Sequence, residues 1–294
     1  MELTMTATDR RQQVRKILAG TECLYPASIY DPVSARIAET LGFEIGMLAG
    51  SIASATVLGA PDLALLTLTE LAEQVHRITR SCSLSLMVDA DHGYGNALNV
   101  MRTVEELEAA GVSALTIEDT LLPHHFGQGK WEKLISVEEL SGKLRAALAA
   151  RRDPSLVIVG RTVAIRSEGI SGVLTRIKAC AEAGVDAIFL VGVKTRQEIA
   201  AIHQATSLPL LLGTLPSSIS DRDFLSANGV RIALQGHIPF RVMVKALHEI
   251  YRHLREGGSP VDFEDKAASG ELVNLVLNDA GYTRFRHDYL GESK

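Results

Sequence analysis

The chain is poor in cysteine and has no long uninterrupted apolar run. Cys23, Cys82 and Cys180 are few, odd in number and without metal-ligand spacing, which argues against a disulfide framework and favours a reducing cytoplasm. The uncharged run Ile45–Pro61 is short for a membrane span and is interrupted by Gly, Ser and Thr, so we interpret it as a buried strand followed by a loop. Residues 1–16 are polar and lack the apolar segment of a secretory signal. We therefore expect a cytoplasmic protein without a membrane partner.

An excess of basic residues is absent as well. The chain has 30 Lys and Arg against 35 Asp and Glu, a formal net charge of −5. This balance provides no excess of positive charge for binding nucleic acid. A hydrophobic content of 46% supports a sizeable core, and 294 residues is near the usual size of a (β/α)8 barrel.

Short apolar segments recur along the chain and predict β-strands. Most are continuous rather than alternating, as expected of parallel strands that are covered on both faces. The eight predicted strands are Leu24–Ser28, Ile45–Gly50, Leu84–Asp89, Ala114–Glu118, Leu156–Thr162, Ala187–Val193, Pro209–Thr214 and Arg231–Gln235.

Amphipathic segments separate these strands and predict helices. They include Thr69–Arg80, Asn99–Ala110, Val137–Arg151, Ser171–Ala183 and Arg196–Thr206. Repeated strand–helix alternation favours an α/β protein with a (β/α)8 TIM barrel, and a doubly wound open sheet is the alternative.

The barrel is expected to end before a separate C-terminal segment. A helix is predicted over Pro239–Glu256, and the Gly257–Pro260 segment interrupts it. We therefore divide the chain into a catalytic barrel, residues 1–256, and a helical arm, residues 257–294. The arm contains a helical patch at Glu271–Asn278 and packs either on its own barrel or on a neighbouring subunit.

The segment that follows the third predicted strand carries two carboxylates, Asp89 and Asp91. Side chains at i and i+2 of an extended chain point the same way, and two buried like charges are costly unless a cation or protons neutralise them. Gly93 and Gly95 then allow a sharp turn. The pattern indicates a site for Mg2+ or Mn2+, which prefer oxygen ligands. A turn with capping aspartates is the alternative.

Other polar residues follow the remaining strands, and in a barrel such strand ends converge. They are Gly50 and Ser51, Asp62, Glu118 and Asp119, Arg161, and Gly236 and His237. Carboxylates would hold the cation, and the planar guanidinium of Arg161 would bind a carboxylate of a ligand. The alternatives are that Asp119 caps the next turn, that Arg161 pairs with a barrel carboxylate, and that His237 has only a structural role.

Together these residues resemble the isocitrate lyase/phosphoenolpyruvate mutase superfamily. The motifs that carry the resemblance are Tyr30–Arg36, Ala49–Ser51, Pro61–Asp62, Asp89–Gly95, Thr116–Asp119 and Gly160–Thr162. The resemblance implies a barrel whose last helix is exchanged between subunits, a homotetramer, and Mg2+ or Mn2+ as cofactor. It also implies a small 2-oxo or 2-hydroxy dicarboxylate as substrate.

Within this superfamily the chain is most similar to the bacterial oxaloacetate decarboxylases. That branch is supported by Asp89–Arg102, Ile117–Pro123 with Phe126 and Gly127, and Gly236 with His237. The resemblance implies Mg2+-dependent conversion of oxaloacetate to pyruvate and CO2 through an enolate.

The resemblance also implies a role for each site residue. Asp91 would contact the metal directly, while Asp62, Asp89 and Glu118 would mostly hold its waters. The substrate would be bound by Gly50, Ser51, Arg161 and His237, with Arg161, His237 and Asp62 forming the catalytic group.

Two further functions remain as alternatives. One is a carbon–carbon lyase acting on a substituted malate such as 2,3-dimethylmalate or methylisocitrate. Such lyases carry a cysteine acid in the mobile loop, and here the loop Pro123–Lys133 has none. The other is a keto-acid-binding paralogue without turnover, suggested by Val163 and Leu215, which stand where the decarboxylases carry Asn and Tyr.

Overall fold

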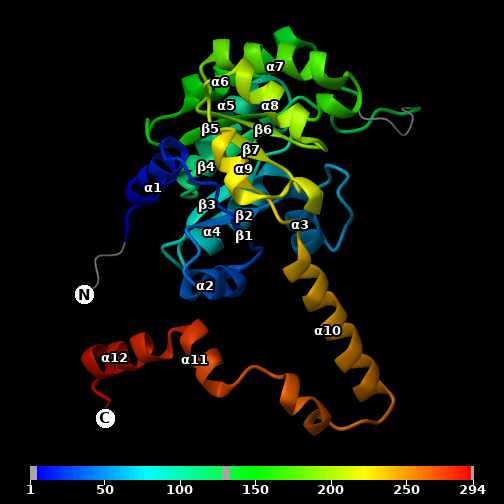
Figure 1. Ribbon diagram of the computed structural model, residues 1–294. Helices are drawn as coiled ribbons and strands as arrows, with labels where there is room; N and C mark the ends of the chain where they lie inside the picture. The colour runs from blue at the N-terminus through cyan, green and yellow to red at the C-terminus, as the bar shows by residue number, and fades with distance from the viewer. Residues whose placement is uncertain (1–4, 128–132, 293–294) are drawn as a thin grey trace.

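The computed structural model of the chain describes residues 5–127 and 133–292. Its centre is a curled sheet of parallel strands that follow one another in sequence order (Figure 1). The strands are β1 (Ala27–Ser28), β2 (Ile45–Leu48), β3 (Ser85–Asp89), β4 (Ala114–Glu118), β5 (Val157–Thr162), β6 (Ala187–Leu190), β7 (Leu210–Leu212) and β8 (Val230–Ala233). Leu24 brings the first and last strands together, because its amide donates to the Arg231 carbonyl and its carbonyl accepts from the Ala233 amide. The predicted α/β fold and its eight strands are confirmed as a TIM-barrel-like sheet.

Helices surround the sheet, and consecutive helices from α4 to α8 pack against one another. The helices are α1 (Ala7–Ala19), α2 (Pro32–Thr40), α3 (Gly50–Ala53), α4 (Leu68–Thr79), α5 (Ala97–Ala109), α6 (Val137–Ala150), α7 (Gly169–Ala183), α8 (Arg196–Ala205), α9 (Arg222–Ala227), α10 (Ile238–Arg255), α11 (Gly270–Leu277) and α12 (Asp279–Leu290). Among the described helices, none combines the length and apolarity that crossing a membrane requires.

Local sequence sets the ends of these helices. Thr67 is the N-cap of α4: its hydroxyl oxygen accepts from the Glu70 amide, and the Glu70 carboxylate accepts from the Thr67 amide. Gly184 ends α7 with a φ of 93°, a left-handed conformation that costs other residues roughly 1–2 kcal/mol. Gly184 therefore ends α7 shortly before β6 begins at Ala187.

Alternate strand residues face the barrel interior, and their character changes along the strands. Toward the amino ends they form an apolar cluster of Ile45, Met47, Met87, Ala114, Val157, Val159, Ala187, Phe189, Leu211 and Ile232. Val14 and Leu18 of α1 belong to the same cluster and close this end of the barrel. Two residues further along, the inward-facing side chains of several strands are polar, which places charged groups at the carboxyl ends.

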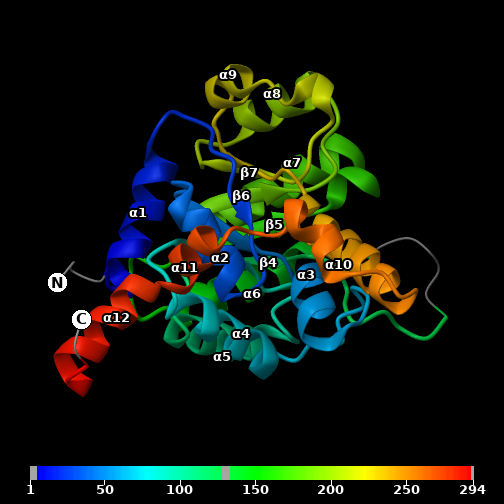
Figure 2. The same cartoon turned by 90° about the horizontal axis from the view of Figure 1, so that it is seen from below.

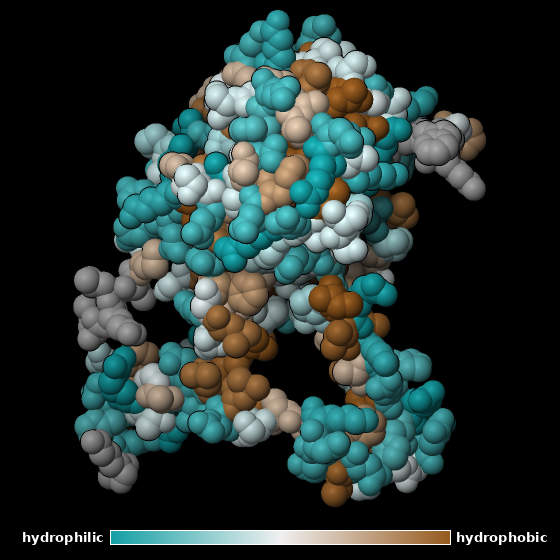
Figure 3. All heavy atoms as spheres, in the orientation of Figure 1, coloured by the Kyte–Doolittle hydropathy of each residue, from teal (hydrophilic) through white to brown (hydrophobic). Residues whose placement is uncertain are grey.

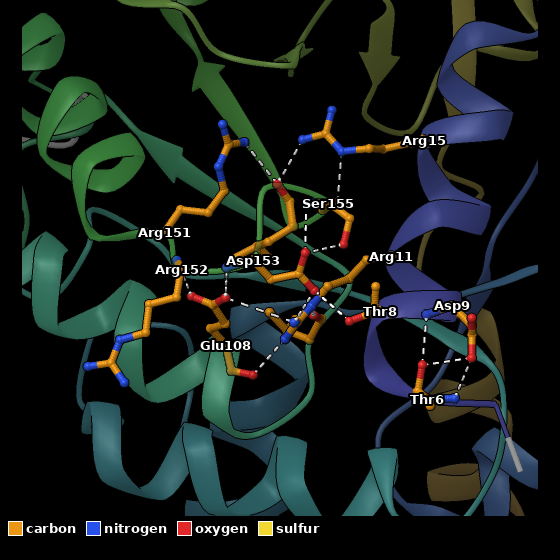
Figure 4. A network of polar contacts seen from close by, with 12 residues as sticks. Thr6, Thr8, Asp9, Arg11, Arg15, Glu108, Arg151, Arg152, Asp153 and Ser155 are labelled. Carbon is orange, nitrogen blue, oxygen red and sulfur yellow. Dashed lines mark hydrogen bonds and ion pairs between the residues drawn. The ribbon is translucent and has the colours of Figure 1, made fainter.

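Arginines of α1 attach this helix to the segments that enter β4 and β5 (Figure 4). Arg11 donates to the Val112 carbonyl at 3.0 Å and to Asp153 Oδ2 at 2.8 Å, and its side chain is 6% exposed. Arg15 donates to the Ser155 carbonyl at 2.9 Å and pairs with Asp186 at 3.0 Å. These donors are paired, so they stabilise the barrel rather than offer a binding site.

The interpretation of Ile45–Pro61 as a strand followed by a loop is wrong after Leu48. The chain forms α3 and then a π-helical turn, Ser54–Leu58, that ends at Gly59 with a φ of 64°. Small residues and Ser in this segment fit against the carboxyl ends of the strands, where tertiary packing overrides weak local propensity. Helices α1, α2 and α12 are also absent from the sequence-based assignment.

The C-terminal segment leaves the barrel instead of covering it. None of the residues of α10 is buried, although this helix has 18 residues and a strongly amphipathic sequence. Figures 1 and 2 show α10 projecting from the barrel, with α11 returning beneath α2. Arg36 of α2 donates to the Val276 carbonyl of α11 at 3.0 Å.

We expect the α1 attachment to be a major source of stability. Arg11→Met removes one partner of a buried ion pair and should lower the unfolding free energy by about 3 kcal/mol. Burial opposes ionisation of Asp153, but hydrogen bonds from Ser155, Arg11 and Thr8 outweigh it and hold the Asp153 pKa well below its usual value. The carboxylate therefore stabilises the fold above the unfolded pKa of about 3.9, and this contribution is lost as the pH falls below that value.

Urea unfolding of the wild type and Arg11→Met at pH 7 and pH 3 measures both effects, and the difference between the two proteins should shrink at pH 3. Arg77→Met is the matched control, because Arg77 pairs with Glu73 on the surface with half of its side chain exposed. Equal midpoints for the two variants at pH 7 would contradict this account.

Candidate active site

A cavity of about 330 Å3 opens at the carboxyl ends of the strands. Of the residues predicted at the strand ends, the cavity is lined by Ser51, Asp62, Asp89, Asp91, Glu118, Arg161 and His237. Gly50 lies against Asp91 at its edge, whereas Asp119 and Gly236 are not part of the lining. The lining is Met47, Ala49, Ser51, Asp62, Ala64, Asp89, Asp91, Glu118, Thr120, Leu122, His124, Arg161, Val163, Arg166, Phe189, Val191, Gly213, Thr214, Leu234 and His237. The predicted convergence of residues from distant strands is therefore observed.

Asp89 ends β3 and is the best-connected carboxylate of the cavity. Its Oδ1 accepts from Thr116 Oγ1 at 2.9 Å, and its Oδ2 accepts from Arg161 Nη1 at 2.5 Å. The Asp91 amide also donates to Asp89 Oδ1 at 3.3 Å. Thr116 was not among the predicted site residues, although its place two residues before Glu118 on β4 puts it on the same face.

Asp91 lies in a strained turn and packs closely on α3. Its φ of 46° is left-handed, which is uncommon for a residue other than glycine. A Cβ at Gly50 would lie 2.4 Å from Asp91 Oδ1, so only glycine admits the carboxylate here. Gly93 has a φ of 78°, and a Cβ there would lie 2.4 Å from Val100 Cγ2. These two glycines are required by the turn that presents Asp91.

The carboxylates of the cavity disfavour one another's charge. Burial raises the pKa of Asp91 well above its usual range, and the neighbouring charges of Asp89, Glu118 and Asp62 add to the effect. Burial raises the pKa of Glu118 to about 7, although Arg161 acts in the opposite direction. Partial burial and Asp89 raise the pKa of Asp62 at the cavity mouth. The site therefore has a greater affinity for positive charge than Arg161 satisfies.

Arg161 lies between two of these carboxylates. Besides Asp89, its Nη2 is 3.0 Å from Glu118 Oε2, and its guanidinium carbon is 5.5 Å from the centre of the Phe189 ring. The pairing of Arg161 with barrel carboxylates, which the sequence left as the alternative, is thus what the structure shows. Arg161 still lines the cavity, so its planar group borders any bound ligand.

His237 lines the cavity, whereas Asp119 lies outside it. His237 precedes α10, lines the cavity, and its Nδ1 is 2.9 Å from Ser28 Oγ. Burial lowers the His237 pKa, and the Asp89 and Asp62 charges oppose this shift.

The alternative that Asp119 caps the next turn is wrong, because Asp119 is fully buried and its Oδ2 is 3.3 Å from Arg176 Nη1. Barrel closure brings Arg176 of α7 to this point.

The loop after β4 is described only in part. Its two ends pair, since the Leu121 amide donates to the Lys133 carbonyl at 2.7 Å. His124 lines the cavity, and Phe126 is fully exposed. Residues 128–132 of the loop Pro123–Lys133 lie outside the described part of the chain.

Comparison with known proteins places this geometry in a family. The family model described as phosphoenolpyruvate phosphomutase matches residues 14–255. A protein of Bradyrhizobium diazoefficiens named oxaloacetate decarboxylase is 49% identical over 99% of this chain and 100% of its own length. One of Rhodopseudomonas palustris with the same name is 53% identical over 92% of this chain and 93% of its own. The chain belongs to the PEP mutase/isocitrate lyase superfamily.

Solved structures of the superfamily share the whole fold. A phosphonopyruvate hydrolase in complex with oxalate and Mg2+ aligns with a TM-score of 0.84 and 30% identity, over 97% of this chain and 100% of that one. An oxaloacetate acetylhydrolase in complex with the inhibitor 3,3-difluorooxalacetate gives a TM-score of 0.84 and 27% identity, over 97% and 98% of the two chains. The arm is therefore included in the superfamily likeness.

The donor set fits a hard divalent cation that keeps part of its water shell. Within residues 5–127 and 133–292, no group of three or more His, Cys, Asp or Glu side chains converges closely enough to hold an ion directly. Mg2+ is commonly bound through one or two carboxylates, with water and substrate completing its octahedron. The cavity matches this chemistry, since four carboxylates line it and, among the described residues, no arginine contacts Asp91.

Neutralising Asp91 should have opposite effects without and with metal. Asp91→Asn removes a buried like charge, so the metal-free protein should gain about 1 kcal/mol, or roughly 2–4 °C in melting temperature. The variant should also lose most of its Mn2+ affinity and of the stabilisation by added Mg2+.

Calorimetric Mn2+ titration and thermal melts with and without Mg2+ measure these effects. Asp265→Asn in the exposed arm is the matched control and should behave as wild type. A less stable metal-free Asp91→Asn protein that still binds Mn2+ normally would show that Asp91 is a structural residue.

Proposed function

We propose that this protein decarboxylates oxaloacetate to pyruvate and CO2 with Mg2+, or Mn2+ in its place. The observation that carries the proposal is the buried carboxylate cluster around Asp91, whose excess negative charge requires a cation. Oxaloacetate presents a 2-oxo group beside its C1 carboxylate, a natural chelate for a hard cation. Relatives at about half identity over nearly the whole chain carry the corresponding name.

Each site residue then has a role that its position supports. Asp91 binds the cation, while Asp89, Glu118 and Asp62 hold its water shell. The bound cation supplies positive charge beside the oxo group, which lowers the energy of the enolate. Arg161 keeps Asp89 and Glu118 in place and borders the substrate carboxylate. Gly50 and Ser51 complete the carboxylate pocket.

His237 acts at the oxo end of the substrate. Its Nδ1 is engaged with Ser28, which fixes the ring, and its lowered pKa favours the neutral form. A neutral imidazole orients the keto group by hydrogen bonding without competing with the cation for the site.

Lyase chemistry on a substituted malate has less support. Such a reaction needs an acid that protonates the carbanion product, and the superfamily lyases supply a thiol. The three cysteines of this chain all lie in the described part, and none lines the cavity. Burial raises the pKa of Cys23 to about 11 and that of Cys180 to about 12, so these thiols are inert. Buried free thiols also accord with a reducing cytoplasm.

The arm supports an assembly in which copies exchange α10. An apolar groove of about 260 Å3 lies beside α2 at the start of α10. It is lined mainly by Ile29, Ile37, Ala38, Leu41, Phe43, Ile238 and Pro239. Leu41 is 71% exposed there, and Figure 3 shows apolar side chains around the gap between barrel and arm.

We propose that α10 of a second copy covers this groove, and that residues 257–294 form the arm of a helix-exchanged homotetramer. An 18-residue amphipathic helix without buried residues is accounted for if a partner buries its apolar face.

Purified protein should release pyruvate from oxaloacetate far faster than the spontaneous background with Mg2+, and only at background with EDTA. Asp91→Ala should reduce kcat/KM at least about 100-fold, because the cation loses its main anchor. Coupled lactate dehydrogenase detection measures pyruvate, and circular dichroism checks the fold. Turnover that is unaffected by EDTA would reject the metal-dependent mechanism.

Leu247→Glu with Leu254→Glu places two charges on one face of α10 and should dissociate the assembly. Both leucines are about two-fifths exposed in the single chain, at 41% and 39%. Light scattering after size exclusion measures the mass, and Lys245→Ala on the same helix should retain the wild-type value. A wild type that is monomeric at micromolar concentration would refute the exchange.

A further inference from the structure

The turn that presents Asp91 is strained along most of its length. Asp91 and Tyr94 have positive φ values of 46° and 60°, and Gly93 and Gly95 have values of 78° and 147°. A left-handed conformation is unfavourable for a residue that carries a Cβ. Asp91 therefore keeps this conformation only if the surrounding structure holds the backbone in place.

Neutral donors hold two carbonyl groups of this turn. The Asp91 carbonyl accepts from the Glu118 amide of β4 at 2.8 Å. The Gly93 carbonyl accepts from the Thr103 hydroxyl of α5 at 3.1 Å, and this hydroxyl also lies 3.0 Å from the Asn99 carbonyl. Thr103 is fully buried, so its hydroxyl is used inside the fold and not by solvent.

Lys143 of α6 holds the carbonyl between these two. Its Nζ donates to the His92 carbonyl at 3.0 Å, and the residue is only 3% exposed. Within residues 5–127 and 133–292 it forms no ion pair, although the charges of Glu139 and Glu118 act on it at longer range. Burial lowers the Lys143 pKa, which reflects the cost of an ammonium group in this position. A lysine buried at such a cost makes its hydrogen bond to the turn the feature to explain.

Lys143 does not reach the cavity. It is absent from the lining, whereas Asp91 is part of it. Its helix, α6, packs against α5 and against β4 and β5, the elements behind the turn. Any effect of Lys143 on a bound cation therefore passes through the backbone at His92.

We propose that Lys143 is a positioning residue that fixes the Asp91 turn in the conformation that binds the divalent cation. The proposal rests on the part of the proposed function in which Asp91 is the cation ligand. The carbonyls of residues 91, 92 and 93 belong to three successive peptide planes, and Lys143 holds the middle one. Without this donor the middle plane can rotate, and the turn can relax from the positive φ that directs Asp91 into the cavity.

The charge of Lys143 and its hydrogen bond have opposite effects on cation binding. A positive charge near the site repels a cation, so removal of the charge alone would tighten binding. Removal of a donor that orients a metal ligand weakens binding. A lysine that merely supports the fold would change the stability of the protein and leave its cation affinity as it is.

Lys143→Met keeps the length and the apolar stem of the side chain and removes both donor and charge. Calorimetric titration should show Mn2+ binding about tenfold weaker than in the wild type, as for other groups that orient a metal ligand. The Mg2+ concentration that gives half-maximal oxaloacetate turnover should rise by a similar factor. The kcat at saturating Mg2+ should stay within about threefold of wild type, because the bound cation restores the position of Asp91.

Two further variants make the test specific. Thr103→Val removes the neighbouring donor at nearly equal volume and without a change of charge, so it should weaken Mn2+ binding about threefold through the same relaxation of the turn. Lys178→Met is the matched control, because Lys178 lies on the surface of α7 with 78% of its side chain exposed and pairs with Glu182. This control should bind Mn2+ as the wild type does, and melting temperatures show whether each variant is folded.

The outcomes separate the positioning role from the function on which it rests. Wild-type Mn2+ affinity in both Lys143→Met and Thr103→Val overturns the positioning role, and so does tighter binding by Lys143→Met. A wild type that binds no Mn2+ overturns the cation site, and with it the proposed function. Weaker Mn2+ binding by Lys143→Met, in a protein whose wild type does not turn over oxaloacetate, supports the positioning role and rejects the decarboxylase.

Discussion

The accumulation of buried carboxylates around a single paired guanidinium governs the carboxyl end of this barrel. Arg161 contacts Asp89 and Glu118, yet Asp91 lies beside them with a raised pKa and without an arginine partner. Such an arrangement is unfavourable for the isolated protein, so the strained turn at Asp91 and the close approach of Gly50 have to be maintained by the surrounding fold. The same repulsion is what gives the site its affinity for positive charge, so the proposed cation and the electrostatic cost of the site have one cause.

The opposite end of the barrel shows what the same residue types do when their charges balance. Arg11 and Arg15 of α1 are paired with carboxylates and backbone carbonyls and close the amino ends of the strands. One barrel thus has balanced ion pairs at its amino end and an excess of carboxylates at its carboxyl end. Between the two ends lies the apolar interior. Along a strand, the inward-facing side chain changes from apolar to charged within two residues, as from Met87 to Asp89.

The rest of the cavity lining comes from the equivalent inward-facing positions of the other strands. Where β3 and β4 end in carboxylates, Val163 and Val191 follow the ends of β5 and β6, and Arg166, Thr214 and His237 line the same cavity. In the sequence Val163 is only a missing hydrogen-bonding group, whereas in the barrel it is a buried residue of the cavity lining. The amphipathic pattern of α10 is plain in the sequence, and the structure shows that no residue of this helix is buried in the single chain.

Local patterning determined the strands, most helices and the carboxylate pair Asp89 and Asp91, because continuous apolar segments, caps and glycine signals act over a few neighbours. The convergence of Gly50, Ser51, Glu118, Arg161 and His237 could also be expected, since strand ends meet in any barrel. Which of them touch was decided only by the closed sheet. Register sets Arg161 beside Glu118 and Phe189, and α7 packing carries Arg176 to Asp119. These contacts join residues tens of positions apart, and no local periodicity encodes the alignment of one strand with the next.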